Sequence, residues 1–469
     1  SVARRSRRAI VARAESLTRD LADFLTGLHG RVDGRLLSRS VDALIDTLGC
    51  MIFGATQTWS QAAIAHALAS GGEGSATVIG QAAKTSPAMA AFANGSSAHA
   101  FELDDVHEEA ISHPGAVVVP AALALAEDLG ASNLELTEAV VIGYEAMGRA
   151  GIAVGPATHM LAGFHPTSMS GVFGSTAAAG RLLGFDSETL NHAFGVAVSL
   201  ACGTMEFASS GGMAKRIHAG RAAEAGLLAA SLVANGLKGA TDGLAGRYGF
   251  CNVFGTDPRT ELLTDALGSR WMIDEITVKP YAACSDVHPL IQATSELRAE
   301  HQLNADRIDQ IERIEAECPT KAATQNNMDG TASVMAAQYS AQFNIAAAIL
   351  ADPRDPATYQ PDQIADPAIA DLQAKVVSLR KAKEFDDTYA WKMGGRVWIF
   401  LSDGKVLERS VHGQKGSMHD PLSQEQLDAK FQSLLGASAP SDLVSTLRCH
   451  LADPLRPASQ ICELLTQAR

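Results

Sequence analysis

Apolar residues recur at helical spacing through the first half of the chain. The clearest stretches run from Leu36 to Ile52 and from Leu136 to Ala153, where apolar side chains return every three or four positions. Alanine, leucine and glycine dominate this half and β-branched clusters are few, which favours helices over strands. The pattern therefore predicts a body that is mostly α-helical.

The pattern changes from about Ser269 onward and becomes a mixture of strands and helices. The expected elements are strands at Trp271–Val278 and Gln310–Ala316, a helix from His288 to Glu300 between them, and a β-hairpin formed by Arg396–Leu401 and Val406–Val411 around the turn Asp403-Gly404. Helical spacing returns after Gly416, with Ser423 as the expected N-cap of the next helix.

Together these segments predict a mostly α fold in two parts. Residues 1–267 and 413–469 are expected to form a large all-helical domain, and residues 268–412 an inserted, smaller α/β domain. The chain has 469 residues, about three times the commonest domain size, so more than one hydrophobic core is expected.

Composition and charge narrow the classes of partner. Apolar residues make up 46% of the chain and charged residues 19%, which is typical of a globular protein. The formal net charge of −14 disfavours nucleic acid and anionic membranes as partners. No apolar run is long enough to cross a bilayer, no signal-peptide core follows the arginine-rich start, and the seven cysteines are scattered, so a cytoplasmic location is expected.

The stretch from Asn94 to Gly115 is rich in ionisable residues. It contains three histidines and five carboxylates: His99, Glu102, Asp104, Asp105, His107, Glu108, Glu109 and His113. Grouped acids need facing cations or a raised pKa, and either condition suits general acid–base chemistry. Two alternatives stay open. One is a charged loop that caps helices. The other is a metal site built from His99, His107, His113 and the carboxylates, whose spacing matches no standard motif.

Two further stretches carry candidate functional residues within the helical half. In the segment 161–174, glycine and proline fix a turn around His165. A buried structural histidine is the alternative interpretation there. A Gly/Ser turn at 209–212 then leads into a helix with four candidate cations, Lys215, Arg216, His218 and Arg221. A helix start with such side chains favours anion binding, and the alternative is a solvated basic face.

The junction of the two predicted parts carries a fourth group. Lys279, Tyr281, Cys284 and His288 lie within ten residues. Cys284 is a candidate nucleophile, but no partner spacing distinguishes it from an inert thiol. The chain has no phosphate-binding loop, no Gly-x-Ser-x-Gly elbow and no dinucleotide fingerprint, which disfavours nucleotide-driven chemistry and the usual serine-hydrolase mechanism.

In this order, the four motifs resemble those of the MmgE/PrpD family, which includes 2-methylcitrate dehydratase, cis-aconitate decarboxylase and iminodisuccinate epimerase. The motifs are His99…Glu102-Leu-Asp-Asp105…His113-Pro-Gly, Gly163-Phe-His-Pro-Thr167, Lys215-Arg-Ile-His-x-Gly220 and Lys279-Pro-Tyr-x-x-Cys…His288-Pro. The resemblance implies that the α/β part is a lid on the helical domain, that the active site lies in the cleft between them, and that the protein is a homodimer. It implies no metal and no organic cofactor.

The resemblance also implies roles for individual residues. The expected catalytic residues are Glu102, His113, His165, Lys215 and His288. The expected substrate-binding residues are Asp105, Thr167, Arg216, His218, Lys279 and Tyr281. A small polycarboxylate is the implied substrate.

Two departures from the family pattern bear on the reaction. Many members read Asp-Phe-Asp-Asp-Thr where this chain has Glu102-Leu-Asp-Asp-Val106, so a carboxylate is kept and a hydroxyl is lost. Decarboxylase members carry a tyrosine at the position that Phe343 resembles. A phenolic proton donor is missing at that position, which weighs against decarboxylation.

The leading hypothesis is a cofactor-independent lyase or isomerase that abstracts a proton next to a carboxylate, as a dehydratase or an epimerase. Lys215 and Arg216 would stabilise the developing negative charge, and His113 or His165 would move the proton. A cis-aconitate-type decarboxylase is the alternative within the family. A non-catalytic binder of small anions and a metal-dependent hydrolase are the alternatives from other classes.

Overall fold

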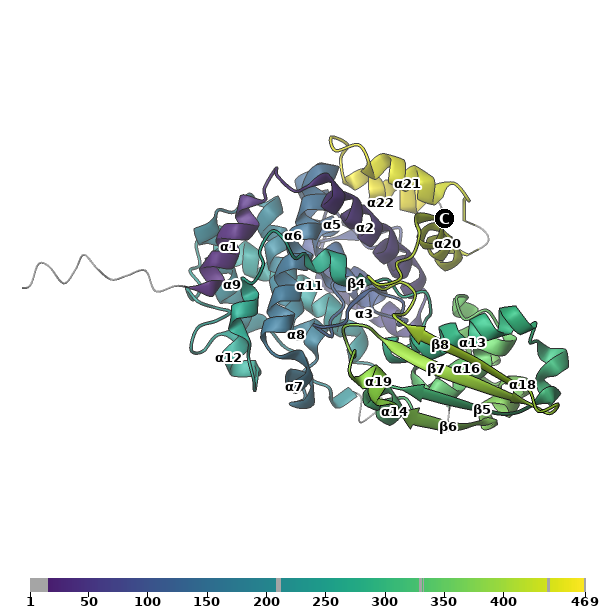
Figure 1. The fold of residues 1–469 in the computed structure, drawn as a ribbon. Helices are drawn as coiled ribbons and strands as arrows, with labels where there is room; N and C mark the ends of the chain where they lie inside the picture. The colour runs from purple at the N-terminus through teal and green to yellow at the C-terminus, as the bar shows by residue number, and fades with distance from the viewer. Residues whose placement is uncertain (1–15, 208–211, 329–330, 332, 437–438, 468–469) are drawn as a thin grey trace, which may run out of the picture.

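The computed structural model describes residues 16–207, 212–328, 331, 333–436 and 439–467. Its fold is mostly α, as predicted. Figure 1 shows a large body of helices beside a smaller region that contains a twisted sheet. The helices of the body are α1 (Leu17–Gly27), α2 (Gly34–Gly54), α3 (Thr58–Ser70), α4 (Pro87–Ala98), α5 (Gly115–Leu129), α6 (Asn133–Ala153), α7 (Pro156–Leu161), α8 (Pro166–Leu182), α9 (Ser187–Ala197), α11 (Lys215–Ala234) and α12 (Phe250–Phe254).

The helical body surrounds one large apolar core. The two clearest predicted helices are confirmed as α2 and α6, and both contribute fully buried residues such as Leu48 and Val140. α5, α6, α8 and α11 pack against one another around Val117 and Phe173. A capping box at Ser132 fixes the start of α6, because the serine and Glu135 each satisfy a backbone N–H of the other.

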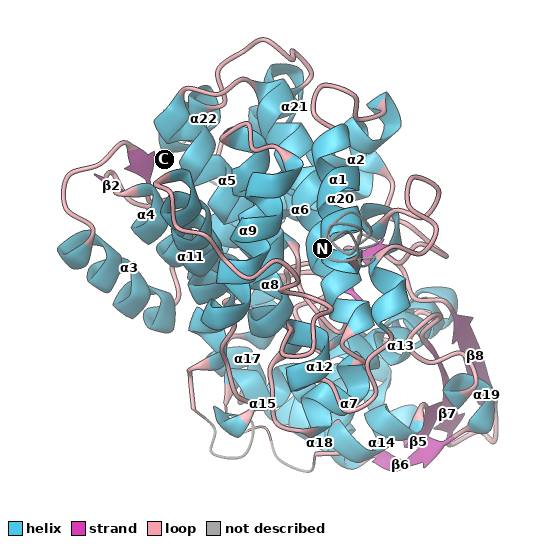
Figure 2. Ribbon diagram, turned by 90° about the vertical axis from the view of Figure 1, so that its left-hand side faces the viewer, coloured by secondary structure: helices cyan, strands magenta, loops and turns pink. Residues whose placement is uncertain are grey.

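A four-stranded sheet and its helices enclose a second apolar core. The strands β5 (Ile311–Cys318), β6 (Val376–Lys381), β7 (Gly394–Leu401) and β8 (Val406–His412) lie in the order β6-β5-β7-β8, with β5 and β6 parallel. The remaining helices of this region are α13 (His288–His301), α14 (Thr320–Gln325), α15 (Val334–Tyr339), α16 (Ala341–Leu350), α17 (Pro361–Ile364), α18 (Pro367–Ala374) and α19 (Lys383–Asp386). Figure 2 shows that the sheet lies at one side of these helices.

Three sequence predictions in this region are confirmed. The strand near residue 310 is β5, the helix that begins at His288 is α13, and the hairpin is β7 and β8. Gly404 adopts a φ of +83° in the hairpin turn, a conformation that glycine adopts at little cost. Residues such as Leu290, Ile314 and Val397 fill the core between sheet and helices.

The predicted strand Trp271–Val278 is mostly wrong. Residues Met272–Glu275 form a 3-10 turn, and only β4 (Ile276–Thr277) is extended. β4 pairs with β3 (Val106–His107) and not with the four-stranded sheet. The Met272 backbone N–H donates to Glu145 of α6, and Ile273 and Ile276 pack in the first core, so contacts with the helical body override the alternating pattern. The remaining sheet is the pair β1 (Ala76–Thr77) and β2 (Lys84–Thr85).

The C-terminal helices return to the helical body, as expected. They are α20 (Gln424–Leu435), α21 (Leu443–Leu451) and α22 (Ser459–Gln467). Ser423 is the N-cap of α20, in a capping box with Gln426, and α20 packs against α2 (Figure 1). The buried Lys430 ammonium of α20 donates to Asp46 of α2 at 2.6 Å and to the Leu103 carbonyl at 2.8 Å. One buried cation thus ties α20 to α2 and to the acidic loop.

Two glycines allow α4 and α11 to approach closely. A Cβ at Gly95 would lie 2.8 Å from the Gly220 Cα, and a Cβ at Gly220 would lie 2.1 Å from the Phe92 carbonyl oxygen. Only glycine, which has no Cβ, fits at these two positions of the helix crossing. The contact places the start of α11, with Lys215 and Arg216, beside the end of α4, where His99 follows.

None of the helices in the described parts of the chain is long and apolar enough to cross a membrane.

We expect Lys430→Met to destabilise the protein by about 3 kcal/mol or more, because Asp46 would keep its burial and lose its cation. Urea unfolding at pH 7 measures the effect. Lys383→Met is the control, since Lys383 pairs with Asp387 on the surface and its loss should cost about 0.5 kcal/mol or less. The double variant Asp46→Asn/Lys430→Met should recover part of the lost stability. A Lys430→Met protein as stable as the control would contradict the role of Lys430 as the cation that compensates the buried Asp46 carboxylate.

Candidate active site

The loop between α4 and α5 lies where the two apolar cores meet, and its side chains alternate. Phe101 and Leu103 pack in the second core. Glu102 lies between these two residues in the sequence and Asp104 follows them. Both acidic side chains are equally buried, but they engage charged groups of the helical body. The apolar pair therefore anchors the loop, and the acidic pair forms the centre of the candidate site.

Three cations converge on the Glu102 carboxylate. The Lys215 ammonium forms an ion pair with it, the Arg216 guanidinium lies 2.9 Å away, and the Lys279 ammonium lies 3.7 Å away. Lys215 and Arg216 come from the first turn of α11, whereas Lys279 follows β4. The exposed fraction is 5% for Lys215 and 1% for Lys279, so this cluster is shielded from water.

The cations keep Glu102 ionised. Burial alone would raise its pKa, but Lys215, Lys279 and Arg216 outweigh burial and hold the pKa well below its usual range. Glu102 also has a φ of +57°, which is strained for a residue with a Cβ. Glu102 was predicted to be catalytic; in this state it is an anion held by three cations and has no proton to give.

Four histidines lie beside this cluster. The ring centroid of His99 lies 5.0 Å from that of His113 and 5.8 Å from that of His165, and the rings of His165 and His218 are 5.0 Å apart. The Nδ1 atoms of His165 and His218 are 2.9 Å apart, so one donates a hydrogen bond to the other. Three of the predicted site histidines, His113, His165 and His218, are thus brought together with Lys215.

Burial and positive charge keep three of the rings, those of His99, His165 and His218, neutral. Burial lowers the pKa of His99 to about 4, and the charge of Lys215 adds to the effect. Burial, with Lys215 again contributing, lowers the pKa of His218 to about 4 and that of His165 well below its ordinary value. At neutral pH these three imidazoles are unprotonated and able to accept a proton.

Asp105 and Thr167 are engaged in internal contacts near the histidines. The Asp105 carboxylate accepts from the Gly115 N–H at 2.8 Å and from the Tyr144 hydroxyl at 2.7 Å. Burial raises its pKa to about 7, although the Tyr144 hydrogen bond opposes that shift. The Thr167 hydroxyl, in the first turn of α8, accepts from the His113 N–H at 3.2 Å. Both residues contribute contacts that hold the site together, and the substrate-binding role that the family resemblance implies for them stays a prediction.

His288, Tyr281 and Cys284 lie on the side of the second core. His288 is fully buried and its Nε2 lies 3.1 Å from the Ala283 carbonyl, and burial, with Lys279 next, lowers its pKa to about 3. Its ring packs against Tyr281 at 5.1 Å. Burial raises the pKa of the Cys284 thiol to about 12, so it is a poor nucleophile. Among the residues that the structure describes, no hydrogen bond, ion pair or ring contact joins His288 or Tyr281 to the histidine cluster.

Four residues of the site were not among the predicted site residues. His99 and Asp104 belong to the acidic loop and lie inside the cluster. Trp59 stacks under the Arg216 guanidinium at 5.6 Å. The Tyr339 hydroxyl, at the end of α15, lies 3.0 Å from the Lys215 ammonium. Trp59 and Tyr339 carry no motif that sequence inspection could have recognised, because both reach the site through the tertiary fold.

The phenol next to Lys215 therefore comes from Tyr339 and not from position 343. Phe343 is fully buried in the second core, with its ring 6.0 Å from that of Tyr359. Burial raises the pKa of Tyr339 well above its ordinary value, so it keeps its proton. The site thus has a neutral phenol, and a phenylalanine at 343 is no longer an argument against a reaction that needs one.

His99, Asp104 and His113 form a group whose ligand atoms lie within 4.8 Å of one another, the spacing of a metal site. Its chemistry fits protons better. His113 Nδ1 lies 2.7 Å from the Asp105 carbonyl oxygen, which only accepts hydrogen bonds, so this nitrogen carries a hydrogen and not a metal. The metal site suggested by the sequence also included His107, which lies 3.5 Å from Glu275 and belongs to another part of the loop.

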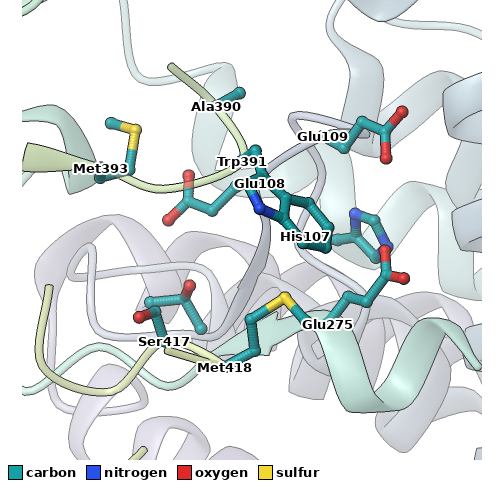
Figure 3. A pocket seen from close by; sticks show the side chains of 10 residues that line it. His107, Glu108, Glu109, Glu275, Ala390, Trp391, Met393, Ser417 and Met418 are labelled. Carbon is teal, nitrogen blue, oxygen red and sulfur yellow. The ribbon is translucent and has the colours of Figure 1, made fainter. Parts of the chain in front are cut away.

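A small hollow of about 340 Å³ lies beside the acidic loop and is distinct from the histidine cluster. Figure 3 shows His107, Glu109 and Glu275 around it, with Trp391 and Met418 opposite. None of its lining residues belongs to the groups around Glu102 or Asp104. In this conformation the histidine cluster is closed, with 6% of His165 exposed.

Two family models together match most of the chain. The MmgE/PrpD N-terminal domain matches residues 9–263, and the MmgE/PrpD C-terminal domain matches residues 281–447. The chain belongs to the MmgE/PrpD family. The first match contains Glu102, His113, His165 and Lys215, and the second contains Tyr281, His288 and Tyr339.

Several proteins named cis-aconitate decarboxylase are similar to this chain over nearly its whole length. A cis-aconitate decarboxylase of Aspergillus terreus is 29% identical over 451 residues, which cover 92% of this chain and 91% of the relative. The human cis-aconitate decarboxylase is 30% identical over 448 residues, 92% of this chain and 90% of the relative. A cis-aconitate decarboxylase of Mus musculus is 28% identical over 449 residues, which cover 92% of this chain and 89% of the relative. Family and relatives together make this chain an enzyme of the lyase type.

We expect Asp105→Asn to change how stability depends on pH. The raised pKa means that folded Asp105 holds its proton up to about pH 7, whereas the unfolded chain releases it near pH 4. The stabilising contribution of this residue is therefore fully present below about pH 4 and decreases as the pH rises to about 7. The variant lacks this decrease, so its stability relative to the unsubstituted protein should increase across that window. Urea unfolding between pH 4 and 8 tests this, and parallel curves for the two proteins would contradict it.

Proposed function

We propose that the protein is a cofactor-independent lyase that moves a proton on a carbon next to a carboxylate of a small di- or tricarboxylate. The convergence of Lys215, Arg216 and Lys279 beside neutral histidines carries this proposal. Three positive charges face the carboxylate of Glu102, which balances only one of them. A substrate with two carboxylates near the cations would neutralise them.

The proposed chemistry divides the work between the two groups. A carbon next to a carboxylate is a very weak acid, and the negative charge that develops on deprotonation needs strong electrostatic stabilisation. Lys215 and Arg216 would hold that charge, with the Tyr339 hydroxyl as a neutral hydrogen-bond donor beside them. A neutral imidazole would take the proton. Loss of hydroxide from the neighbouring carbon completes a dehydration, and reprotonation on the other face completes an epimerisation.

Decarboxylation of a cis-aconitate-like acid is the second candidate, and the named relatives favour it. In that reaction the bond to a carboxylate breaks, carbon dioxide leaves, and the electron pair forms a carbanion conjugated with another acid group. A protonated side chain then supplies the proton. The same cations would stabilise this carbanion, and Tyr339 is a phenol in reach of Lys215.

Access to the site requires movement. Lys279 and Tyr339 approach Glu102 and Lys215 from the side of the second core. We propose that the region containing the four-stranded sheet acts as a lid, which opens to admit the substrate and closes to exclude water. The homodimer and the boundaries of the two domains stay predictions.

The decisive experiment incubates the purified protein with citrate, cis-aconitate, malate and aspartate-like acids in deuterated water and follows each by NMR. An alkene product indicates dehydration, carbon dioxide with one new deuteron indicates decarboxylation, and deuterium at an inverted centre indicates epimerisation. Binding of these acids without exchange or product would contradict the enzymatic proposal and favour a non-catalytic anion binder.

Lys215→Ala should lower turnover of the identified substrate by about 100-fold or more, the scale of one lost charge-stabilising donor. Arg221→Ala is the matched control, because Arg221 lies on the same helix and pairs with Glu224 outside the cluster. Its turnover should stay near that of the unsubstituted protein. Equal activity of the two variants would remove Lys215 from the proposed mechanism.

A further inference from the structure

The Asp104 carboxylate touches two histidines at once. Its Oδ2 atom lies 2.6 Å from His99 Nδ1 and 3.3 Å from His113 Nδ1. Asp104 is 1% exposed. Burial would raise its pKa, but His99 and His113 outweigh burial and hold the pKa well below its usual value, so it is an anion that only accepts hydrogen bonds.

These contacts decide where each ring carries its hydrogen. A neutral imidazole has one N–H, and a nitrogen that faces a carboxylate must be the one that donates. His99 Nδ1 faces Asp104, and His113 Nδ1 faces both Asp104 and the Asp105 carbonyl oxygen, 2.7 Å away. Both rings therefore carry hydrogen on Nδ1, and Nε2 is the nitrogen with the unshared electron pair whenever either ring is neutral. His99 Nε2 is buried and has no hydrogen-bond partner among the described residues.

The two rings differ in access. His99 is 1% exposed, whereas 13% of the His113 side chain is exposed. The backbone N–H of His113 donates a hydrogen bond to the Thr167 hydroxyl, so the backbone as well as the ring is held in place. Of the two rings bound to Asp104, His113 is therefore the one that a substrate reaches with less rearrangement.

We propose that Asp104 is a positioning residue that fixes the hydrogen of His99 and His113 on Nδ1, so that His113 meets the substrate with an unprotonated Nε2 and acts as its base. This inference rests on the proposed function. In the step, the C–H bond next to the carboxylate breaks and the proton moves to His113 Nε2. The electron pair stays on the substrate, where the cations stabilise it, and Asp104 faces the resulting imidazolium.

The neighbouring histidine pair has a different arrangement. His165 and His218 share one hydrogen bond between their Nδ1 atoms, and within the described parts of the chain neither ring forms an ion pair with a carboxylate. One of these rings donates through Nδ1 and the other accepts, so no fixed tautomer follows for either. Asp104 is thus the feature that separates the His113 group from the His165 group, a distinction that the sequence motifs do not make.

The first test measures the tautomers directly and needs no substrate. Protein labelled with 15N-histidine is examined by long-range 1H–15N correlation NMR at pH 7, with His99→Gln and His113→Gln to assign the signals. We expect both rings to carry hydrogen on Nδ1, and Asp104→Asn to change the pattern of both. A signal for His113 with hydrogen on Nε2 in the unsubstituted protein would overturn the proposal, whatever the reaction is.

The second test uses the substrate identified by the deuterium experiment. Asp104→Asn should lower kcat by at least about 100-fold, the usual contribution of a general base, and leave KM within about threefold. Glu127→Gln is the matched control, since this buried carboxylate accepts from the Thr77 N–H and pairs with Lys84, outside the histidine cluster. A kcat for Asp104→Asn similar to that of the control would overturn the proposal. If Asp104→Asn does not fold, the tautomers of the unsubstituted protein decide.

A metal at the same residues is the competing outcome. Elemental analysis before and after exhaustive chelation distinguishes the two. The proposal expects unchanged activity after chelation. One bound metal ion per chain that is lost in Asp104→Asn, together with loss of activity on chelation, would overturn it.

Discussion

The buried carboxylate of Glu102 constrains the rest of the site. An isolated carboxylate in such surroundings would cost several kcal/mol, and a left-handed backbone at a residue with a Cβ adds about 1–2 kcal/mol. Both costs are tolerated because three cations surround the side chain. Those cations come from α11 and from the segment after β4, so the ion cluster fixes how these parts of the chain meet.

Packing of small and apolar residues brings the charges to this point. Gly95 and Gly220 let α4 and α11 touch, which places the end of one helix beside the start of the other. Phe101 and Leu103 then bind the intervening loop to the second core. Glu102 and Asp104 alternate with these anchors along the loop, and their carboxylates engage Arg216 and His99 of the helical body. The apolar contacts supply the free energy, and the polar residues between them acquire their geometry as a consequence.

Sequence patterns predicted the parts of the fold that local physics determines. α2, α6, α13 and the β7–β8 hairpin follow from periodicity and turn residues. The structure of the segment 271–278 did not follow from its pattern, because contacts with α6 outweighed the alternation of apolar and polar residues. The motif residues His113, His165 and Lys215 do meet in one cluster. Spacing could not show that Asp104 faces the histidines while Asp105 faces Tyr144, nor that Tyr339 reaches Lys215 from the second core, because those contacts exist only in the tertiary structure.

Burial is the main cause of the low pKa values of His99, His165 and His218, and the Lys215 charge that would assist the reaction lowers them further. Lys215 lowers the pKa of His99, His165 and His218, which makes each ring a weaker base. A weaker base helps only if the carbon acid gains more acidity than the base loses basicity. In the proposed reaction, an ammonium in contact with the substrate carboxylate would lie next to the developing negative charge, and in a site shielded from water its effect falls steeply with distance. Lys215 would then favour proton transfer overall, with the substrate carboxylate in the place that Glu102 shares in this conformation.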